Sequence, residues 1–266
     1  MGKTPHKLEN GHTVIFDSDN HKYILNNNYD DPVIGMSSIL KYLAAPKLED
    51  WKRNELVTAI STQMEKNNIP LDKISKIISE AKASMNKKSD NILNTGKVVH
   101  KLAEKWLKGD KITKPDDFVI ANCFMEFQKF WKKHKLKLVE SEKILYSLRG
   151  YCGTLDIIAI DPDGNIWLID IKTSSGLFLN HVHQLHGYKL AYEEQTGKKI
   201  NKMYMVRLPK TGEGFEARQI LYKKEHIKAF LGLLHCHNST KLFKEQMKKL
   251  KDKQKKAKYN GGKNVR

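Results

Sequence analysis

Three charged residues lie in two segments that otherwise read as buried β-strands. The stretch GTLDIIAIDPDGNIWLIDIKTS places Asp156 in the first strand and both Asp170 and Lys172 in the second. Carboxylates are hard oxygen ligands that suit divalent cations such as Mg²⁺ and Mn²⁺. A lysine beside such an ion can handle a proton or stabilise developing charge. These residue types at this spacing are therefore typical of a metal-assisted site.

The turn between the two strands predicts how the acids meet. In the sequence DPDG, the proline suits the first central position of a type I turn, and the glycine suits the left-handed position that closes a three-residue loop. Such a loop pairs Asp161 with Asn165. The same register brings Asp156 opposite Asp170 on one face of the sheet, with Cβ atoms roughly 4.5–5.5 Å apart. Lys172 follows two residues later and shares that face.

Two facing carboxylates repel each other, and burial increases the repulsion. One acid can be protonated, a lysine can bridge the two, or a divalent cation can lie between them; the sequence leaves all three open. The alternative to a metal-assisted site is a surface hairpin whose aspartates are solvated and have no function. The apolar residues on both sides of the strands argue against it, because they leave neither face plainly exposed. A β-bulge that moved the pairing by one residue would remove the predicted contact.

Two helical segments are expected to bring further polar groups to the strands. In GKVVHKLAEKWLKG, His100 and Glu104 are spaced i, i+4 beside an apolar stripe, so a helix presents both from one flank. In NHVHQLHGYKLAY, Gln184 and Tyr188 have the same spacing. Each pair, taken alone, is more typical of helix packing than of a site.

The elements that must position these residues follow from hydrophobic periodicity, which changes from helical to alternating near residue 135. A β-hairpin is expected over 12–25, followed by a short helix over 38–45 capped by Ser37 or Ser38. Further helices are expected over 47–67, 71–87, 89–108, 116–134 and 180–196, and strands over 137–148, 151–161, 165–173, 201–208 and 216–222. We divide the chain into an N-terminal hairpin and helical region (1–88), a core (89–240) and a lysine-rich C-terminal tail (241–266).

Composition excludes several classes of protein. With 266 residues, 39% hydrophobic and 29% charged, the chain suits a soluble globular protein, and no apolar run approaches the ~20 residues of a membrane helix. Three scattered cysteines form no CxxC pair and no apolar leader opens the sequence, so we expect a cytoplasmic location. Half of the net charge of +18 lies in 241–266. This charge predicts a polyanionic partner, most commonly nucleic acid, with a merely solubilising surface as the alternative.

These motifs occur in the order found in the PD-(D/E)XK nuclease superfamily, which residues 30–210 resemble. The closest resemblance is to the RecB-like branch, which includes phage and mitochondrial-type DNA exonucleases. The residues that carry it are the helix with His100, Gly153-x-x-Asp156, Asp170-Ile171-Lys172, Gln184-xxx-Tyr188 and the early segment VIGMSSILKYLAAPKLEDWKRN.

The resemblance implies an α/β fold with a PD-(D/E)XK, restriction-endonuclease-like core, in which a mixed central sheet is flanked by helices and preceded by a helix-rich N-terminal half. It implies Mg²⁺ or Mn²⁺ as the cofactor. The implied metal ligands are Asp156, Asp170, the Ile171 carbonyl and His100, with Glu142 or Glu104 serving a second metal. No iron–sulfur cluster is expected, because the cysteines are not clustered.

The same resemblance implies roles for the remaining polar groups. Lys172 would activate or orient the attacking water, while Gln184 and Tyr188 would position the lysine or the substrate. The candidate DNA contacts are Ser38, Trp51, Lys52 and Arg53. The last three are chosen by residue type, because an aromatic ring can stack on a base and a cation can hold a phosphate; the alternative for Trp51 is a place in the core.

The expected activity is metal-dependent hydrolysis of phosphodiester bonds in DNA. An exonuclease of a recombination, replication or repair system, plausibly phage-encoded and then active in the host cytoplasm, would act on single-stranded DNA or duplex ends. A structure-specific or restriction-type endonuclease of the same fold is an alternative, and so is a non-catalytic nucleic-acid-binding module. No membrane partner is expected, and the sequence leaves protein partners open.

Overall fold

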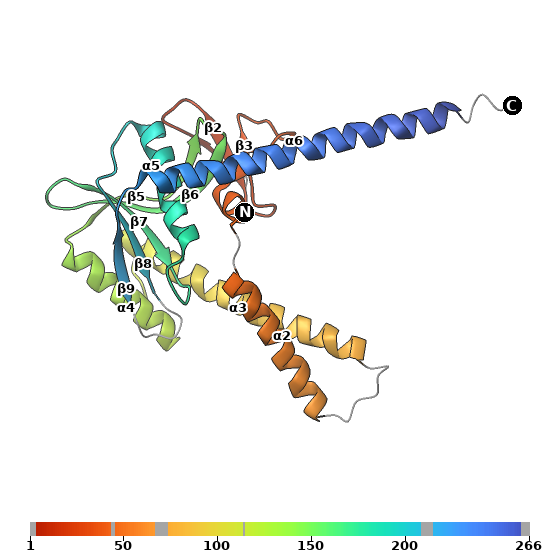
Figure 1. Cartoon of the computed structure of the whole chain (residues 1–266). Helices are drawn as coiled ribbons and strands as arrows, with labels where there is room; N and C mark the ends of the chain where they lie inside the picture. Colours follow the sequence, from red (N-terminus) through yellow and green to blue (C-terminus); the bar gives the residue numbers. More distant parts are fainter. Residues whose placement is uncertain (1–3, 44–45, 67–73, 114, 209–214, 262–266) are drawn as a thin grey trace.

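A mixed sheet lies between two layers of helices in the computed structural model, which describes residues 4–43, 46–66, 74–113, 115–208 and 215–261 (Figure 1). The helices are α1 (Met36–Leu40), α2 (Pro46–Lys66), α3 (Ile74–Leu107), α4 (Phe118–Lys133), α5 (Leu179–Thr196) and α6 (Lys224–Gly261). The strands are β1 (Pro5–Lys7), β2 (Thr13–Asp17), β3 (Lys22–Leu25), β4 (Ile34–Gly35), β5 (Lys137–Ser147), β6 (Tyr151–Ile160), β7 (Ile166–Lys172), β8 (Lys202–Arg207) and β9 (Glu216–Ile220). The expected α/β class with a mixed sheet flanked by helices is confirmed.

Strand β6 is the centre of the main sheet. It pairs antiparallel with β5 along one edge, and its other edge is shared by two strands. Parallel β4 covers Tyr151 and Cys152, whereas antiparallel β7 covers residues 157–160. Beyond β7 come parallel β8 and antiparallel β9. The edge of β6 over residues 153–156 therefore lies between two partner strands.

The hairpin joining β6 and β7 has the predicted register. The Asp161 amide donates to the Asn165 carbonyl at 3.1 Å, and Gly164 adopts φ +82° in the left-handed region. The ladder runs from Ile160 opposite Ile166 to Ile157 opposite Ile169. It ends there, one position before the two aspartates, while β7 remains paired with β8 through Lys172.

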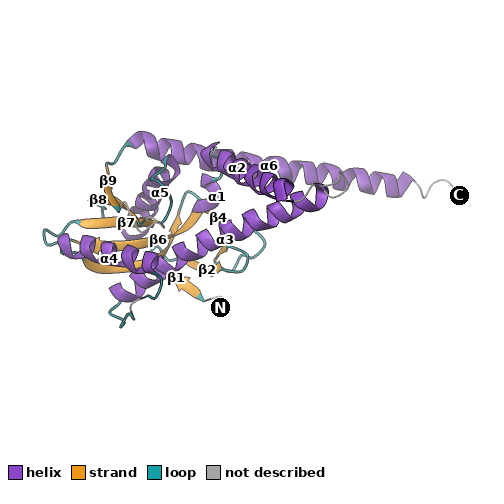
Figure 2. Cartoon of the chain, turned by 90° about the horizontal axis from the view of Figure 1, so that it is seen from below, coloured by secondary structure: helices purple, strands orange, loops and turns teal. Residues whose placement is uncertain are grey.

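Each face of the sheet is covered by its own helices (Figure 2). One face packs against α3 and α4, through the buried side chains Val99, Ala103, Cys123, Phe127, Phe130 and Trp131. The opposite face packs against α1, α5 and α6, through Met36, Ile39, Leu185, Tyr188, Tyr192, Phe230 and Leu234. A small separate sheet, β1–β2–β3, packs beside the start of β6.

Three expectations about the N-terminal half are wrong. Helix α1 begins at Met36 after an extended Gly35, so neither Ser37 nor Ser38 caps it, and it ends at Leu40 rather than at residue 45. The helices expected over 71–87 and 89–108 are one helix, α3. The residues around position 88 have helix propensities within about 1 kcal/mol of alanine, and α3 continues through them and packs along α2.

Both expected domain boundaries fall inside helices, 88/89 in α3 and 240/241 in α6. Figure 1 shows α2 with the first half of α3 projecting from the sheet, and the C-terminal half of α6 extending in another direction. The division into three regions therefore stays a prediction, since neither boundary coincides with the end of a helix or strand. In the described part of the chain, none of the helices combines the length and apolar character needed to span a membrane.

Candidate active site

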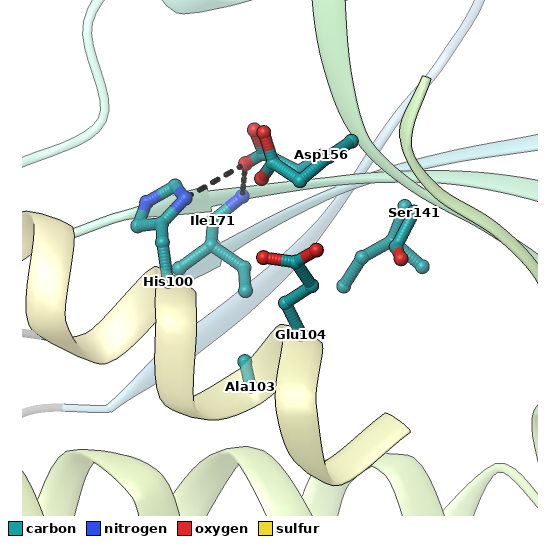
Figure 3. Close-up of a pocket in the computed structure, with 8 residues that line it drawn as sticks. His100, Ala103, Glu104, Ser141, Asp156 and Ile171 are labelled. Carbon is teal, nitrogen blue, oxygen red and sulfur yellow. Dashed lines mark hydrogen bonds and ion pairs between the residues drawn. The ribbon is translucent and has the colours of Figure 1, made fainter. Parts of the chain in front are cut away.

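Asp156 lies where β6 and β7 separate. Its Oδ2 accepts a hydrogen bond from the Ile171 amide at 2.7 Å, and His100 Nδ1 lies 3.6 Å from the same oxygen (Figure 3). A backbone amide of β7 is thus bonded by a side chain of β6, and the regular ladder has already ended at Ile157. The strands fork at this point, and the fork opens the sheet to helix α3, which carries His100.

A group of three possible metal ligands lies at the fork. One ligand atom from each of His100, Glu142 and Asp156 lies within 4.8 Å of the other two. Glu142 comes from β5, where the flanking pairs of the ladder place it across from Asp156. Glu104, one helical turn after His100, lines the same pocket and forms an ion pair with Lys108. An imidazole and carboxylates together could hold a divalent cation.

The backbone is strained at Glu142. Its φ of +49° is in the left-handed region, which a non-glycine residue in a strand rarely adopts. Strand alternation would send Ser141 and Glu142 to opposite faces, yet both line the pocket. We infer that the unusual dihedral turns the second side chain toward Asp156, at a cost of order 1–3 kcal/mol.

Burial and neighbouring negative charges raise the pKa values of two carboxyls at the fork, Glu142 and Asp170. Partial burial, together with the charges of Asp156 and Glu104, raises the pKa of the Glu142 carboxyl to about 7, although part of this residue remains exposed. Burial also raises the pKa of Asp170 above its usual range; Asp156 adds to this shift, while Lys172 opposes it. A bound cation would relieve this crowding, and the donor set therefore fits a hard divalent metal ion.

A second set of contacts leads from β7 to α5. Lys172 Nζ lies 2.6 Å from Asp170 Oδ2 and donates to Gln184 Oε1 at 2.9 Å. Gln184 Nε2 donates in turn to the Tyr188 hydroxyl at 3.1 Å. Asp170 is 1% exposed, and its Oδ1 is buried without a hydrogen-bond partner within the described structure. The lysine is therefore held from two sides, beside a carboxylate oxygen that is free to accept a further ligand.

Tyr188 is fixed by close packing against the backbone of β6. A Cβ added at Gly153 would lie 2.6 Å from Tyr188 Cε1, so only glycine permits the observed approach. Burial raises the pKa of the Tyr188 hydroxyl well above its usual value, and the nearby charges of Asp170 and Asp156 add to that shift. The hydroxyl is consequently neutral at ordinary pH and serves as a hydrogen-bonding group.

The structure brings most of the sequence-predicted site residues together. His100, Glu104, Glu142, Asp156 and Ile171 line one pocket, while Asp170, Lys172, Gln184 and Tyr188 form the connected chain beside it. Asp170 is outside the compact three-residue group, although its charge interacts with those of Asp156 and His100. The contact described for Ile171 is made by its amide, which donates to Asp156. We expected the Ile171 carbonyl to bind the metal, and that role stays a prediction.

The candidate DNA contacts lie in α1 and α2. Ser38 is half-buried in α1. In α2, Lys52 pairs with Glu49 at 2.9 Å, and Arg53 pairs with Asp50 at 3.8 Å. Trp51 is in the same helix, and its side chain lies outside the described part of the structure. These four remain predicted contacts.

Sequence reasoning missed two polar groups near the site. Ser141 lines the pocket, and its buried Oγ has no hydrogen-bond partner among the described residues. Its position beside Glu142 was the available signal, but strand alternation argued against it. His181 of α5 is buried, and burial with the nearby charge of Lys172 lowers its pKa to about 4. Its ring accepts a hydrogen bond from the Phe178 amide, a local contact that a sequence does not reveal.

Comparisons with known proteins give distant likenesses. No family model matches the chain, and no curated protein matches it. Among solved structures, a "Putative exonuclease" from Eubacterium rectale aligns with a TM-score of 0.38 and 14% identity, over 56% of this chain and 66% of that one. The structure of SSO0001 aligns with a TM-score of 0.30 and 15% identity, over 75% of this chain and 82% of that one. With TM-scores this low, neither likeness supports a functional assignment, which must come from the site.

Proposed function

We propose that the chain is a metal-dependent nuclease of the PD-(D/E)XK type, which hydrolyses phosphodiester bonds in DNA. The observation that carries this proposal is the fork between β6 and β7. There the Asp156 carboxylate bonds to β7 at the Ile171 amide, between Asp170 and Lys172. An imidazole from α3 lies beside Asp156, and a glutamine from α5 holds Lys172.

The metal ligands would be Asp156 and Asp170, with His100 and Glu142 completing the set. The free Oδ1 of Asp170 and the crowded carboxyl of Glu142 both support this assignment. A bound Mg²⁺ or Mn²⁺ would neutralise charge on the phosphate and lower the pKa of bound water. Glu104 lines the same pocket and is the candidate for a second ion.

Lys172 would act on the attacking water or on the phosphate. Its ammonium is aimed by Asp170 and Gln184, so little reorganisation is needed when charge develops on the phosphate oxygens. The water oxygen bonds to phosphorus, one bridging P–O bond breaks, and the departing oxygen takes up a proton. The products are a terminal phosphate and a free hydroxyl. Gln184 and Tyr188 are positioning residues in this scheme, because they act through the lysine.

The half of the +18 net charge that lies outside 241–266 supports a polyanionic substrate, because lysines and arginines bind phosphates without regard to sequence. We propose DNA as that substrate and an exonuclease of recombination, replication or repair as the role. The test below separates an exonuclease from an endonuclease of the same fold and from a module that binds without cutting.

The purified full chain is incubated with end-labelled linear DNA and with nicked and closed circular DNA, in Mg²⁺, in Mn²⁺ and in EDTA. We expect metal-dependent loss of linear DNA only. Cutting of closed circles would favour an endonuclease, and a gel shift without cutting in either metal would overturn the catalytic proposal.

Two variants on the same hairpin sharpen the test. Asp156→Asn should abolish cleavage and weaken Mn²⁺ binding measured by titration calorimetry, because it removes a ligand charge. Asp163→Asn is the matched control, since Asp163 is exposed in the turn. If the two variants cleave DNA equally well, Asp156 and the fork take no part in catalysis.

A further inference from the structure

The C-terminal half of α6 carries an apolar stripe that faces away from the body. Earlier in the helix, Phe230 and Leu234 are buried against the sheet layer, at 0% and 4% exposed. Leu234 and Phe243 are nine residues apart, which is two and a half helical turns, so they lie on opposite sides of the helix. Phe243 is 60% exposed, as expected for a residue on the outer side.

The stripe has the spacing of a helix-pairing seam. Phe243, Met247 and Leu250 are spaced i, i+4, i+7, and they are 60%, 38% and 52% exposed. This is the d–a–d pattern of a heptad repeat. Every described side chain from residue 241 to residue 255 is exposed, and Figure 1 shows this part of α6 extending beyond the rest of the chain. The seam therefore lies on a projecting helix with its apolar side in solvent.

Three of the four residues that flank the seam between 244 and 253 are lysines, and the fourth is Gln246. In the same heptad, Lys244 and Lys251 occupy the e positions, and Lys253 occupies a g position. The acids Glu245 and Asp252 occupy the f positions, on the side farthest from a pairing partner. The e and g positions set partner choice, because their charges meet those of the facing helix.

This charge pattern decides among the possible occupants. In an antiparallel second copy Lys244 and Lys251 would face each other at the e positions, and in a parallel copy Lys251 would face Gln246, so neither orientation offers these lysines an acidic partner. A nucleic acid would account for the lysines but would leave the three apolar side chains without a role. A helix with apolar a and d positions and acidic e and g positions satisfies both features.

We propose that residues 240–254 of α6 are a docking surface for an acidic amphipathic helix of a partner protein. The partner's apolar positions would cover Phe243, Met247 and Leu250, and its glutamates or aspartates would pair with the flanking lysines. This interaction is separate from the proposed nuclease site and does not depend on it.

A labelled synthetic peptide tests the surface directly. The probe is a helix of about four heptads with leucine or isoleucine at a and d and glutamate at e and g. We expect it to bind the full chain in EDTA, measured by fluorescence anisotropy, with affinity falling as salt rises. A peptide with lysine at e and g should not bind.

Two double variants separate the apolar and charged parts of the surface. Phe243→Ser with Leu250→Ser should lower affinity for the acidic peptide by about tenfold or more, because two apolar side chains that the peptide would cover are lost. Lys244→Glu with Lys251→Glu should reverse the preference toward the basic peptide. The control is Phe118→Ser, which changes an apolar side chain on α4 that is 79% exposed, and it should bind like the wild type.

Three results would overturn the proposal. The first is equal binding of the acidic peptide by the wild type and the seam variant. The second is a dimer in sedimentation velocity that Leu250→Ser dissociates, since the seam would then bind a second copy. The third is a wild type that does not bind the acidic peptide, together with a Phe243→Ser, Leu250→Ser variant that no longer binds duplex DNA, since the surface would then bind nucleic acid. Circular dichroism is used to check that each variant is folded, as we expect for substitutions at exposed positions.

Discussion

The contact between Gly153 and Tyr188 gives the strongest test of the link between packing and activity. Replacing Gly153 with alanine adds one methyl group on β6, 2.6 Å from Tyr188 Cε1 and 3.2 Å from Met36 Cβ. Both neighbours are core residues, Tyr188 at 5% and Met36 at 2% exposed. The tyrosine must move, because the rest of the core leaves the methyl group nowhere else to go.

The size of the effect follows from these contacts. Carbon atoms pack at about 3.5–4.0 Å, so the Tyr188 ring has to retreat by roughly 1 Å. Overpacking of this kind costs about 1–3 kcal/mol of unfolding free energy. The ring carries the hydroxyl that holds Gln184, and Gln184 holds Lys172. Since a misplacement of about 1 Å can cost about 100-fold in rate, we expect Gly153→Ala to lower the single-turnover cleavage rate by about 10- to 100-fold.

Urea unfolding measures the stability, and single-turnover cleavage of end-labelled DNA measures the rate. Gly232→Ala is the control, because nothing lies within 4 Å of a Cβ at that position on α6, and alanine there should raise stability slightly. Tyr188→Phe keeps the ring and removes only the hydroxyl, so it should slow cleavage without overpacking. If Gly153→Ala has wild-type stability and rate, the close contact between Gly153 and the Tyr188 ring is refuted. If it cleaves slowly but is as stable as wild type, overpacking is not the cause of the slower rate.

Two further predictions concern Lys172 and Asp161. Lys172→Ala should lower the cleavage rate by at least about 100-fold while leaving DNA affinity within a fewfold of wild type, and Lys129→Ala on α4 is the control; a wild-type rate would exclude the lysine from the mechanism. Burial opposes ionisation of Asp161, but hydrogen bonds from Lys202 and Asn165 outweigh it and hold its pKa below the usual range. The resulting stability is present above the unfolded pKa of about 4 and is lost as the pH falls below it, so urea unfolding at pH 3 and pH 7 should differ less in Asp161→Asn than in wild type; an equal difference would contradict this.

The strands and helices of the core were predictable because their signals are local. The DPDG turn fixed the β6–β7 register through Asp161 and Gly164, and the structure shows that register. Strands β1 and β4 were missed, since they have three and two residues and exist only through pairing with distant segments. We expected two helices over 71–87 and 89–108, whereas α3 is continuous and packs along α2, a distant contact that local sequence does not show.

The site was predictable only in part. The helix pairs, with His100 on α3 and Gln184 on α5, do reach the strands that carry the acids. The expected facing of Asp156 and Asp170 rested on a ladder that continued past Ile157, but the ladder stops there. The Asp156 carboxylate accepts the hydrogen bond from the Ile171 amide, which a backbone carbonyl of β6 would accept if the ladder continued. A side chain that replaces a backbone partner leaves no mark in the periodicity of the sequence.

Three irregularities of the main sheet meet at the level of Asp156, and together they explain why the site is there. Strand β5 has its left-handed residue at Glu142, the β4/β7 edge of β6 lacks a ladder partner over 153–156, and β7 leaves β6 at Asp170. Each one costs stability, through strain, unused strand pairing or crowded carboxylates. A sheet selected for stability alone would close the ladder and place an apolar residue at position 156. The cores on both faces of the sheet must offset these costs. The opened ladder leaves Asp156 in contact with His100 from one helical layer, while Lys172 beside Asp170 is held by Gln184 from the other.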